Sequence, residues 1–164
     1  MLGEKIGEET GKVTVRRVLP CQGSGPMMET SFQAQGSILG IAHQTTGTYT
    51  STIRPDGSLI GSGQGLVMNA EGGTASWVGQ GVGLIGKDGS VRYRGAIFYQ
   101  TAFPKWARLN SVAAVFEYDV DPQGNTKAQI SEWKWRCANQ HSKFADRASG
   151  RRAADLGKQS GAAA

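Results

Sequence analysis

The chain has 164 residues, of which 38% are hydrophobic, and its formal net charge is +5. That length fits one domain, because single domains mostly contain about 100–200 residues. No stretch reaches the ~18 consecutive apolar residues of a membrane span, and the charged start MLGEKIGEETGK differs from a secretory leader. The composition therefore predicts one cytoplasmic domain without a membrane partner.

The excess positive charge lies near the C-terminus. Residues 1–133 contain 11 Lys or Arg and 11 Asp or Glu, whereas residues 134–164 contain 7 Lys or Arg and 2 Asp. A basic tail can hold nucleic acid or another anionic partner by releasing counterions. This tail carries no aromatic RNA-binding motif, so it favours a flexible terminus. Nucleic-acid or anion binding is kept as an alternative function.

Turn motifs recur at short, even spacing along the chain. Asp-Gly and Gly-Gly pairs supply the positive φ angles of tight hairpin turns. The runs between these turns are rich in Thr, Val, Ile, Tyr and Trp, which suit a pleated sheet. In chain order, the predicted strands are residues 12–19, 28–39, 44–54, 58–68, 74–85, 90–101, 110–120 and 126–136. A short helix is predicted from Ala138 onward.

About eight strands joined by hairpins predict an all-β fold, an antiparallel up-and-down barrel of calycin-like type. Closure removes the exposed sheet edges, and the short hairpins favour this order over a two-sheet sandwich. The barrel domain would span residues 12–137, between an N-terminal arm at 1–11 and the basic tail at 138–164. Cys21 and Cys137 would lie at opposite ends, too far apart for a disulfide. This indicates free thiols and a reducing compartment.

Strand alternation predicts which side chains line the barrel. If Asp56-Gly57 and Asp88-Gly89 are two-residue turns, the more apolar face of the flanking strands points inward. The predicted lining is then Tyr49, Ser51, Ile53, Ile60, Gln64, Leu66, Met68, Val78, Gln80, Val82, Leu84, Tyr93, Ile97 and Tyr99. Its polar members would either satisfy one another across the barrel or orient a small, mostly apolar ligand.

On this assignment, the alternating glycines of the same strands face outward. Gly61, Gly63 and Gly65 would lie on one strand, and Gly79 and Gly81 on the next. They would either permit the strands to bend or let another subunit pack closely against flat backbone. The second alternative predicts a homo-oligomer.

A pair of carboxylates is the first candidate for chemistry. A turn at Gln123-Gly124 would make Glu117 and Glu132 diagonal neighbours on one face. Inside the barrel, two close carboxylates would raise one pKa and could transfer protons. Outside the barrel they would be solvated, and the other face, with Tyr118 and Trp133, would be the core.

His43 and the segment at residues 103–106 are the other candidates. His43 shares the inward parity of Tyr49 and is either a hydrogen-bonded structural residue or a catalytic group. The segment Phe103-Pro104-Lys105-Trp106 would be either a lid or a hydrophobic plug. No metal-ligand spacing, nucleophile elbow or phosphate-binding loop before a helix is found, so neither a metal nor a cofactor is predicted.

Several segments resemble a group of uncharacterised bacterial and archaeal proteins. These are RVLP (17–20), GTYTSTIRPDGSLIGSGQG (47–65), WVGQGVG (77–83) and NSVAAVFEY (110–118). The meander of that group is similar to the allene oxide cyclase-like barrel. The enzymes of that family form trimers, bind a fatty-acid epoxide in a barrel cavity and steer its cyclisation. The resemblance spans roughly residues 11–136 and carries no catalytic residue onto this chain.

The function that follows is the binding of a small, mostly apolar molecule in a barrel cavity. A cyclase or isomerase acting there on an apolar substrate is the alternative. The candidate ligand-binding residues are His43, Tyr49, Gln64, Gln80, Tyr99, Trp106, Glu117 and Glu132.

Overall fold

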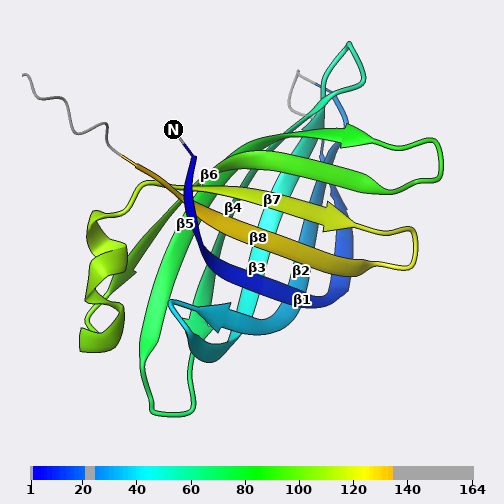
Figure 1. The fold of residues 1–164 in the computed structure, drawn as a ribbon. Helices are drawn as coiled ribbons and strands as arrows, with labels where there is room; N and C mark the ends of the chain where they lie inside the picture. Colours follow the sequence, from blue (N-terminus) through cyan, green and yellow to red (C-terminus); the bar gives the residue numbers. More distant parts are fainter. Residues whose placement is uncertain (1, 21–24, 135–164) are drawn as a thin grey trace, which may run out of the picture. The chain divides into compact units, whose positions relative to one another are not determined.

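The computed structural model describes residues 2–20 and 25–134. It is an all-β barrel (Figure 1), whose elements are β1 (Leu2–Leu19), β2 (Met27–Ile38), β3 (Ile41–Ile53), β4 (Leu59–Met68), β5 (Thr74–Ile85), β6 (Val91–Thr101), the 3-10 helix η1 (Pro104–Ser111), β7 (Ala114–Val120) and β8 (Asn125–Trp133). Each strand pairs antiparallel with the next, and β1 pairs with β8. The predicted closed, eight-stranded, up-and-down barrel is therefore confirmed.

Some predictions fall outside the described residues. These are the thiol state of Cys21 and Cys137, the helix from Ala138 and the tail at 138–164. Within the described ranges, no helix is long and apolar enough to cross a membrane.

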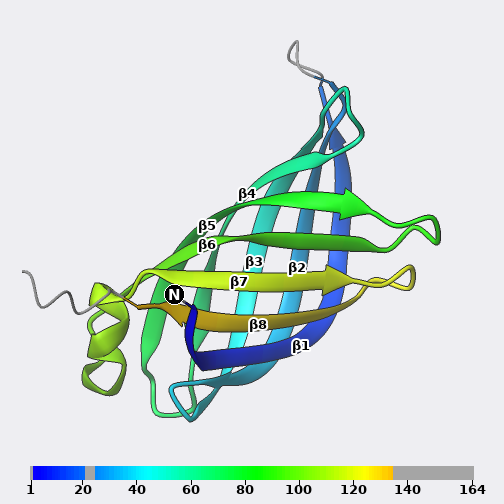
Figure 2. The same cartoon turned by 45° about the horizontal axis from the view of Figure 1, so that its top comes forward.

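The first strand is much longer than predicted, and its early part closes the barrel. Residues 7–12 pair with β2 on one side and with β8 on the other, as Figure 2 shows for β1 between these two strands. The predicted N-terminal arm at residues 1–11 is therefore wrong for residues 2–11, which are strand. The segment was missed because its glycines and charged residues lack the β-branched side chains that mark a strand.

Four hairpins share one turn type, and it is not the predicted one. Gly57, Gly72, Gly89 and Gly124 have φ of 81–85°, and each N–H donates to the carbonyl three residues earlier. The N–H of Arg54 donates to the carbonyl of Ser58, and that of Gly86 donates to the carbonyl of Ser90, so residues 55–57 and 87–89 form the loops. Each loop therefore holds three residues, with glycine in the left-handed position of a bulge.

That single extra loop residue reverses the predicted faces of two strands. A one-residue shift in register moves every side chain of a strand to the opposite face. The predicted inward positions of β3 and β6, such as Tyr49 and Tyr99, do point inward, except that Ile53 at the end of β3 is 37% exposed. Those of β4 and β5 point outward. The residues corrected in this way are Ile60, Gln64, Leu66, Met68, Val78, Gln80, Val82 and Leu84.

The glycines of β4 and β5 face the interior, and aromatic rings occupy the space beside them. A Cβ on Gly83 would lie 2.5 Å from the Tyr93 ring, and one on Gly65 would lie 2.5 Å from Trp77. A Cβ on Gly81 would lie 3.0 Å from Phe116. Glycine is needed at these positions because large rings from neighbouring strands fill the barrel.

The outer face of β4–β6 is correspondingly apolar. Val78 and Phe98 are paired across β5 and β6 and are 57% and 52% exposed, and Leu84 is 66% exposed. The predicted contact of outward glycines with another subunit is therefore wrong, because those glycines point inward. The homo-oligomer itself stays a prediction.

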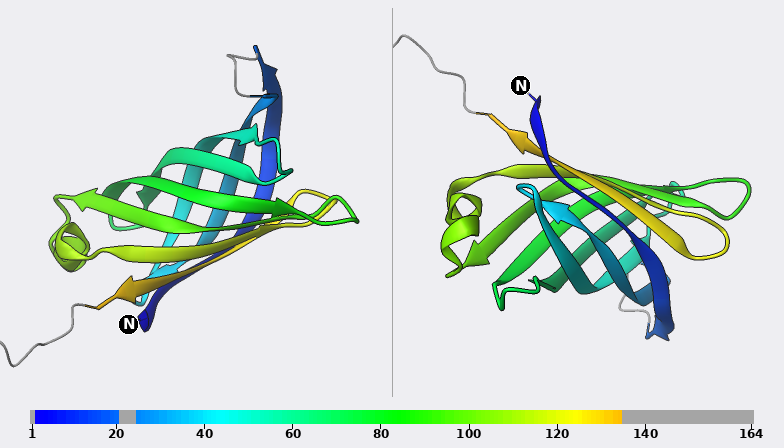
Figure 3. Two further views of the ribbon diagram at one scale, coloured as in Figure 1. Left: turned by 90° about the horizontal axis from the view of Figure 1, so that it is seen from above. Right: turned by 60° about the horizontal axis from the view of Figure 1, so that its bottom comes forward.

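The helix η1 closes one end of the barrel. Figure 3 shows it at the end opposite the β5–β6 and β7–β8 turns. Its Trp106 and Leu109 are 0% and 1% exposed, and the indole N–H of Trp106 donates to the carbonyl of Ile38 at 3.3 Å. Of the two roles predicted for residues 103–106, this packing matches the plug.

Candidate functional site

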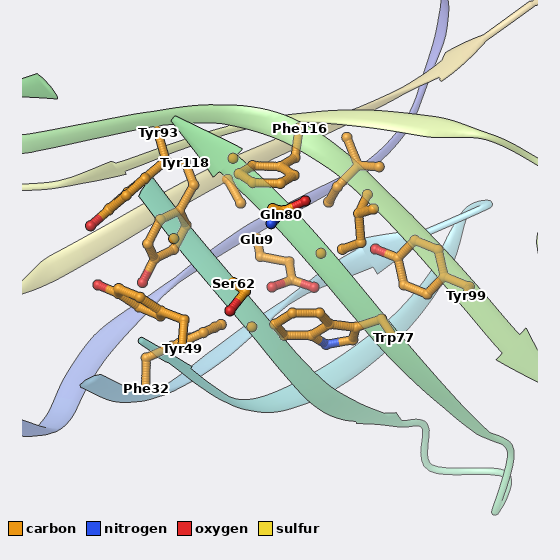
Figure 4. Close-up of a pocket in the computed structure, with 17 residues that line it drawn as sticks. Glu9, Phe32, Tyr49, Ser62, Trp77, Gln80, Tyr93, Tyr99, Phe116 and Tyr118 are labelled. Atoms are coloured by element: carbon orange, nitrogen blue, oxygen red, sulfur yellow. The ribbon is translucent and has the colours of Figure 1, made fainter. Parts of the chain in front are cut away.

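A cavity of about 80 Å³ lies inside the barrel. This is several times the roughly 10–15 Å³ that one water molecule requires, and well below the ~300–1,000 Å³ of pockets for drug-sized ligands. Figure 4 shows aromatic side chains around it, with the Glu9 carboxylate among them. The lining includes Phe32, Tyr49, Trp77, Tyr93, Tyr99, Phe116 and Tyr118.

The wall formed by β4 and β5 is thin. Gly61, Gly63, Gly79 and Gly81 line the cavity from these two strands, and they contribute no side chains. Ser62 and Gln80, which pair across the same strands, are exposed to solvent and also border the cavity. The cavity therefore comes closest to the surface at this glycine wall.

Glu9 is the one charged residue in the cavity lining. It lies on β1, is 8% exposed, and its Oε1 accepts hydrogen bonds from His43 Nε2 and Thr45 Oγ1, both at 2.9 Å. Among the described residues, none donates to its Oε2. Two donors on one oxygen stabilise the ionised carboxylate, and the second oxygen is left available to a bound molecule.

His43 is held in place from both sides. Its side chain is 0% exposed, and its ring lies edge-on to Trp106 with centroids 6.4 Å apart. Its Nδ1 is buried and has no hydrogen-bond partner within the described part of the chain. An imidazolium would bury a second N–H without an acceptor, which is costly. The hydrogen bond to the Glu9 carboxylate therefore places a ring proton on Nε2.

The cavity lies apart from the positive charges of the protein. Every Lys and Arg among the described residues is exposed, and many pair with surface carboxylates, as Lys105 does with Glu71 at 2.6 Å. Within the described ranges, no Lys or Arg side chain pairs with Glu9, the one carboxylate of the cavity lining. A buried carboxylate without a cation is expensive, so a molecule that neutralises it would bind favourably.

The four tyrosines of the chain all line this cavity. Burial raises the pKa of Tyr93 to about 12, even though Ser51 hydrogen-bonds its hydroxyl at 2.6 Å. Burial also raises the pKa of Tyr49, Tyr118 and Tyr99, and the nearby Glu9 carboxylate raises that of Tyr99 further. All four hydroxyls are therefore protonated at neutral pH and can serve as hydrogen-bond donors.

Several of the residues predicted for the site do lie in or beside this cavity. Tyr49 and Tyr99 line the cavity. His43 forms a hydrogen bond with Glu9, and Trp106 packs against His43. Gln80 borders the cavity from an outward-facing position of the glycine wall.

The remaining predicted residues lie elsewhere. Gln64 is exposed on the outer face of β4. Glu117 is exposed and pairs with Arg94 at 3.2 Å, whereas Glu132 pairs with Arg108 at 2.6 Å. Because Glu117 lies opposite Gln129, it does not neighbour Glu132 on one face as predicted. Trp133, a predicted core residue, is 58% exposed.

Sequence reasoning missed Glu9, the residue on which the polar cluster is built. Odd positions 7–13 of β1 read Gly, Glu, Gly and Val, and the intervening positions are Glu, Thr and Lys. Alternation alone therefore gives only a weak inward signal, and a glutamate is expected at the surface. The pairing of β1 with β2 and β8 is what places Glu9 inside.

Two larger hollows lie on the surface of the protein, at about 480 and 400 Å³. The first is bordered by Glu4, Lys5, Lys105 and Arg108, whose charges are already paired with one another or with nearby residues. The second is bordered by Thr, Gln and Lys side chains of β1–β3. Neither contains a buried carboxylate with hydrogen-bonding partners, so the smaller cavity inside the barrel is the stronger candidate. In the described ranges, no group of three or more His, Cys, Asp or Glu could hold a metal ion.

No protein-family model matches this chain, and no curated protein matches it. Solved structures do share its fold. A protein of unknown function from Clostridium acetobutylicum is 14% identical with a TM-score of 0.69, over 79% of this chain and 96% of its own. A conserved protein of unknown function from Rhodopseudomonas palustris is 13% identical with a TM-score of 0.70, over 80% and 97%.

A beta-barrel-like protein from Acinetobacter baumannii is 11% identical with a TM-score of 0.70, over 82% of this chain and 96% of its own. At this identity the likeness concerns the fold alone, because one fold can host many functions. The chain is thus similar in architecture to these three bacterial proteins, two of which are described as having unknown function.

Proposed function

We propose that this protein binds a small, mostly apolar molecule inside the barrel. The observation that carries the proposal is a cavity of about 80 Å³ walled by aromatic rings, into which one buried carboxylate presents an oxygen without a described donor. Binding sites of this kind combine a mostly apolar wall with a few polar groups that orient the ligand. The cavity favours a ligand of a few non-hydrogen atoms.

A cavity-filling variant tests the proposal. At Gly79, an added Cβ would lie 3.3 Å from the Ala96 carbonyl oxygen and 3.6 Å from the Phe116 ring, so alanine fits after a small shift. Because Gly79 lines the cavity, this methyl group would occupy ligand space. Ser76→Ala, at an exposed position of the same strand, is the matched control.

The measurement is ligand-observed NMR with a panel of small alcohols, ketones and amines. At least one probe should bind the natural protein and the Ser76→Ala variant, and should bind Gly79→Ala about tenfold more weakly. Native mass spectrometry of protein from its own host would reveal a retained molecule. If no probe binds, or if Gly79→Ala binds every probe equally well, the interior is not a ligand site.

Proton transfer within the same cavity is the second candidate, in line with the cyclase or isomerase that the resemblance implies. The contact that favours it is the 2.9 Å hydrogen bond between Glu9 and His43. Glu9 would take a proton from one atom of a bound molecule and return it to another. A panel of small ketones in D₂O would show deuterium uptake by NMR, above the level with Glu9→Gln. Equal uptake by both proteins would refute this role.

A further inference from the structure

The interior combines two features that recognise the same kind of ligand. Its wall is made mainly of aromatic rings, and its charged group is a carboxylate. Aromatic faces carry negative potential and attract cations, most strongly when the site is desolvated. A carboxylate with an available oxygen attracts a positively charged N–H donor.

We infer that the ligand class of this cavity is a small alkylammonium ion, held by the aromatic rings and the Glu9 carboxylate. This inference rests on the proposed ligand-binding function. The ammonium N–H would donate to Glu9 Oε2, while the alkyl groups contact rings such as Trp77 and Phe116. The cation would pair with a carboxylate that no Lys or Arg of the described residues contacts.

The geometry of the cluster distinguishes a cation from a neutral or anionic ligand. His43 and Thr45 both donate to Oε1 of Glu9, and His43 Nδ1 lacks a partner. This arrangement fits a neutral imidazole that orients an ionised carboxylate. An anion would meet that carboxylate and the negative faces of the rings. A neutral alcohol could donate one hydrogen bond but would leave the charge uncompensated.

The size of the cavity narrows the ligand class further. An engineered apolar cavity of about 150 Å³ holds benzene, and this cavity is about half as large at roughly 80 Å³. Amines with short or branched alkyl groups, such as trimethylammonium and isopropylammonium, are therefore suitable probes, whereas long-chain amines are not.

The decisive comparison uses isopropylammonium and 2-propanol, which share their carbon skeleton and differ in charge. NMR titrations of the full chain near neutral pH should show isopropylammonium and trimethylammonium binding at least about tenfold more tightly than 2-propanol. Acetate should not bind. If 2-propanol binds as tightly as isopropylammonium, the ligand class is wrong while the barrel remains a ligand site. If neither binds, and no other small probe does, the proposed function fails as well.

Two further changes test the carboxylate and the rings separately. Glu9→Gln keeps the shape of the side chain and one acceptor oxygen, so it should abolish the preference for the ammonium while 2-propanol still binds. Unchanged preference in this variant would overturn the role of Glu9. Nitrogen NMR of His43 should show a neutral ring protonated at Nε2, and an imidazolium would also contradict the inference.

Fluorinated tryptophan withdraws electron density from the indole ring with little change in shape. Trp77 is the tryptophan that lines the cavity in the described part of the chain. Isopropylammonium affinity should fall stepwise with each added fluorine, whereas 2-propanol affinity should stay constant. In Trp77→Phe, fluorination of the remaining tryptophans should have no effect. If fluorination leaves the affinity for isopropylammonium unchanged, the aromatic rings do not hold the cation.

Discussion

Replacement of Glu9 by leucine tests whether the carboxylate holds the interior polar cluster together. Its Oε1 is the acceptor for His43 and Thr45, which are only 5% and 2% exposed. Leucine would leave both donors buried without a partner, and each such group costs about 1–3 kcal/mol. The two added apolar carbons offset roughly 1.6 kcal/mol. The free energy of unfolding should therefore fall by about 0.5–4 kcal/mol.

Urea denaturation followed by tryptophan fluorescence measures this change, with an unchanged m-value as the sign of two-state unfolding. Glu9→Gln keeps an acceptor oxygen, so it should lower stability by less than Glu9→Leu does. Glu8→Leu replaces an exposed neighbour on the same strand and should have little effect.

The cluster should also behave non-additively, because its members share one acceptor. Thr45→Val removes one of the two donors, so it should destabilise the natural protein but restore part of the stability lost in Glu9→Leu. If Glu9→Leu unfolds like Glu8→Leu, or if Thr45→Val destabilises both backgrounds equally, then Glu9 does not accept these two hydrogen bonds.

The remaining predictions concern the turns, the plug and the tyrosines. Gly72→Ala should lower the free energy of unfolding in urea by about 1–2 kcal/mol, because φ is +81° there. The added methyl group contacts no other atom, so backbone strain is the sole expected cause. Gly72→Asn should lower stability less, and an equal loss in both variants would exclude backbone strain. Trp106→Ala should lower the free energy of unfolding by about 3–5 kcal/mol, whereas replacing the exposed Trp133 with alanine should change it by no more than about 0.5 kcal/mol. Similar losses in the two variants would contradict the role of η1 as a hydrophobic plug. Because burial raises the pKa of Tyr93 to about 12 from an ordinary value of 10.0, the unfolded chain loses protons first. Stability should be full below pH 10 and fall between about pH 10 and 12, with phenolate absorbance rising as circular dichroism is lost; phenolate at pH 10–11 in a folded barrel would refute this.

The closed barrel was predictable because hairpin signals are local. Every connection except the η1 segment carries a glycine, and the runs between them are rich in β-forming side chains, so strand number and order could be read along the chain. The seven predicted connections between consecutive strands are confirmed. Closure of the barrel was predictable because unpaired sheet edges are unfavourable. The position of His43 and the inward tyrosines of β3 and β6 could be predicted in the same way.

The lining of β4 and β5 was mispredicted because hydrophobicity pointed to the wrong face. Val78, Val82 and Leu84 are the apolar residues of β5, yet glycines occupy its interior positions. The reason is volume. Rings such as Tyr93 and Phe116 reach across from neighbouring strands, and a side chain on the facing glycines would collide with them.

The sequence by itself determined the order of the strands and their antiparallel pairing, because both depend on residues that are neighbours along the chain. The register of the turns, the inward glycines and the burial of Glu9 were decided only by the tertiary structure. Glu9 meets His43, 34 residues away, after β1 has been enclosed between β2 and β8. Neither residue carries a local signal of the other, because a contact across a barrel depends on how all eight strands close.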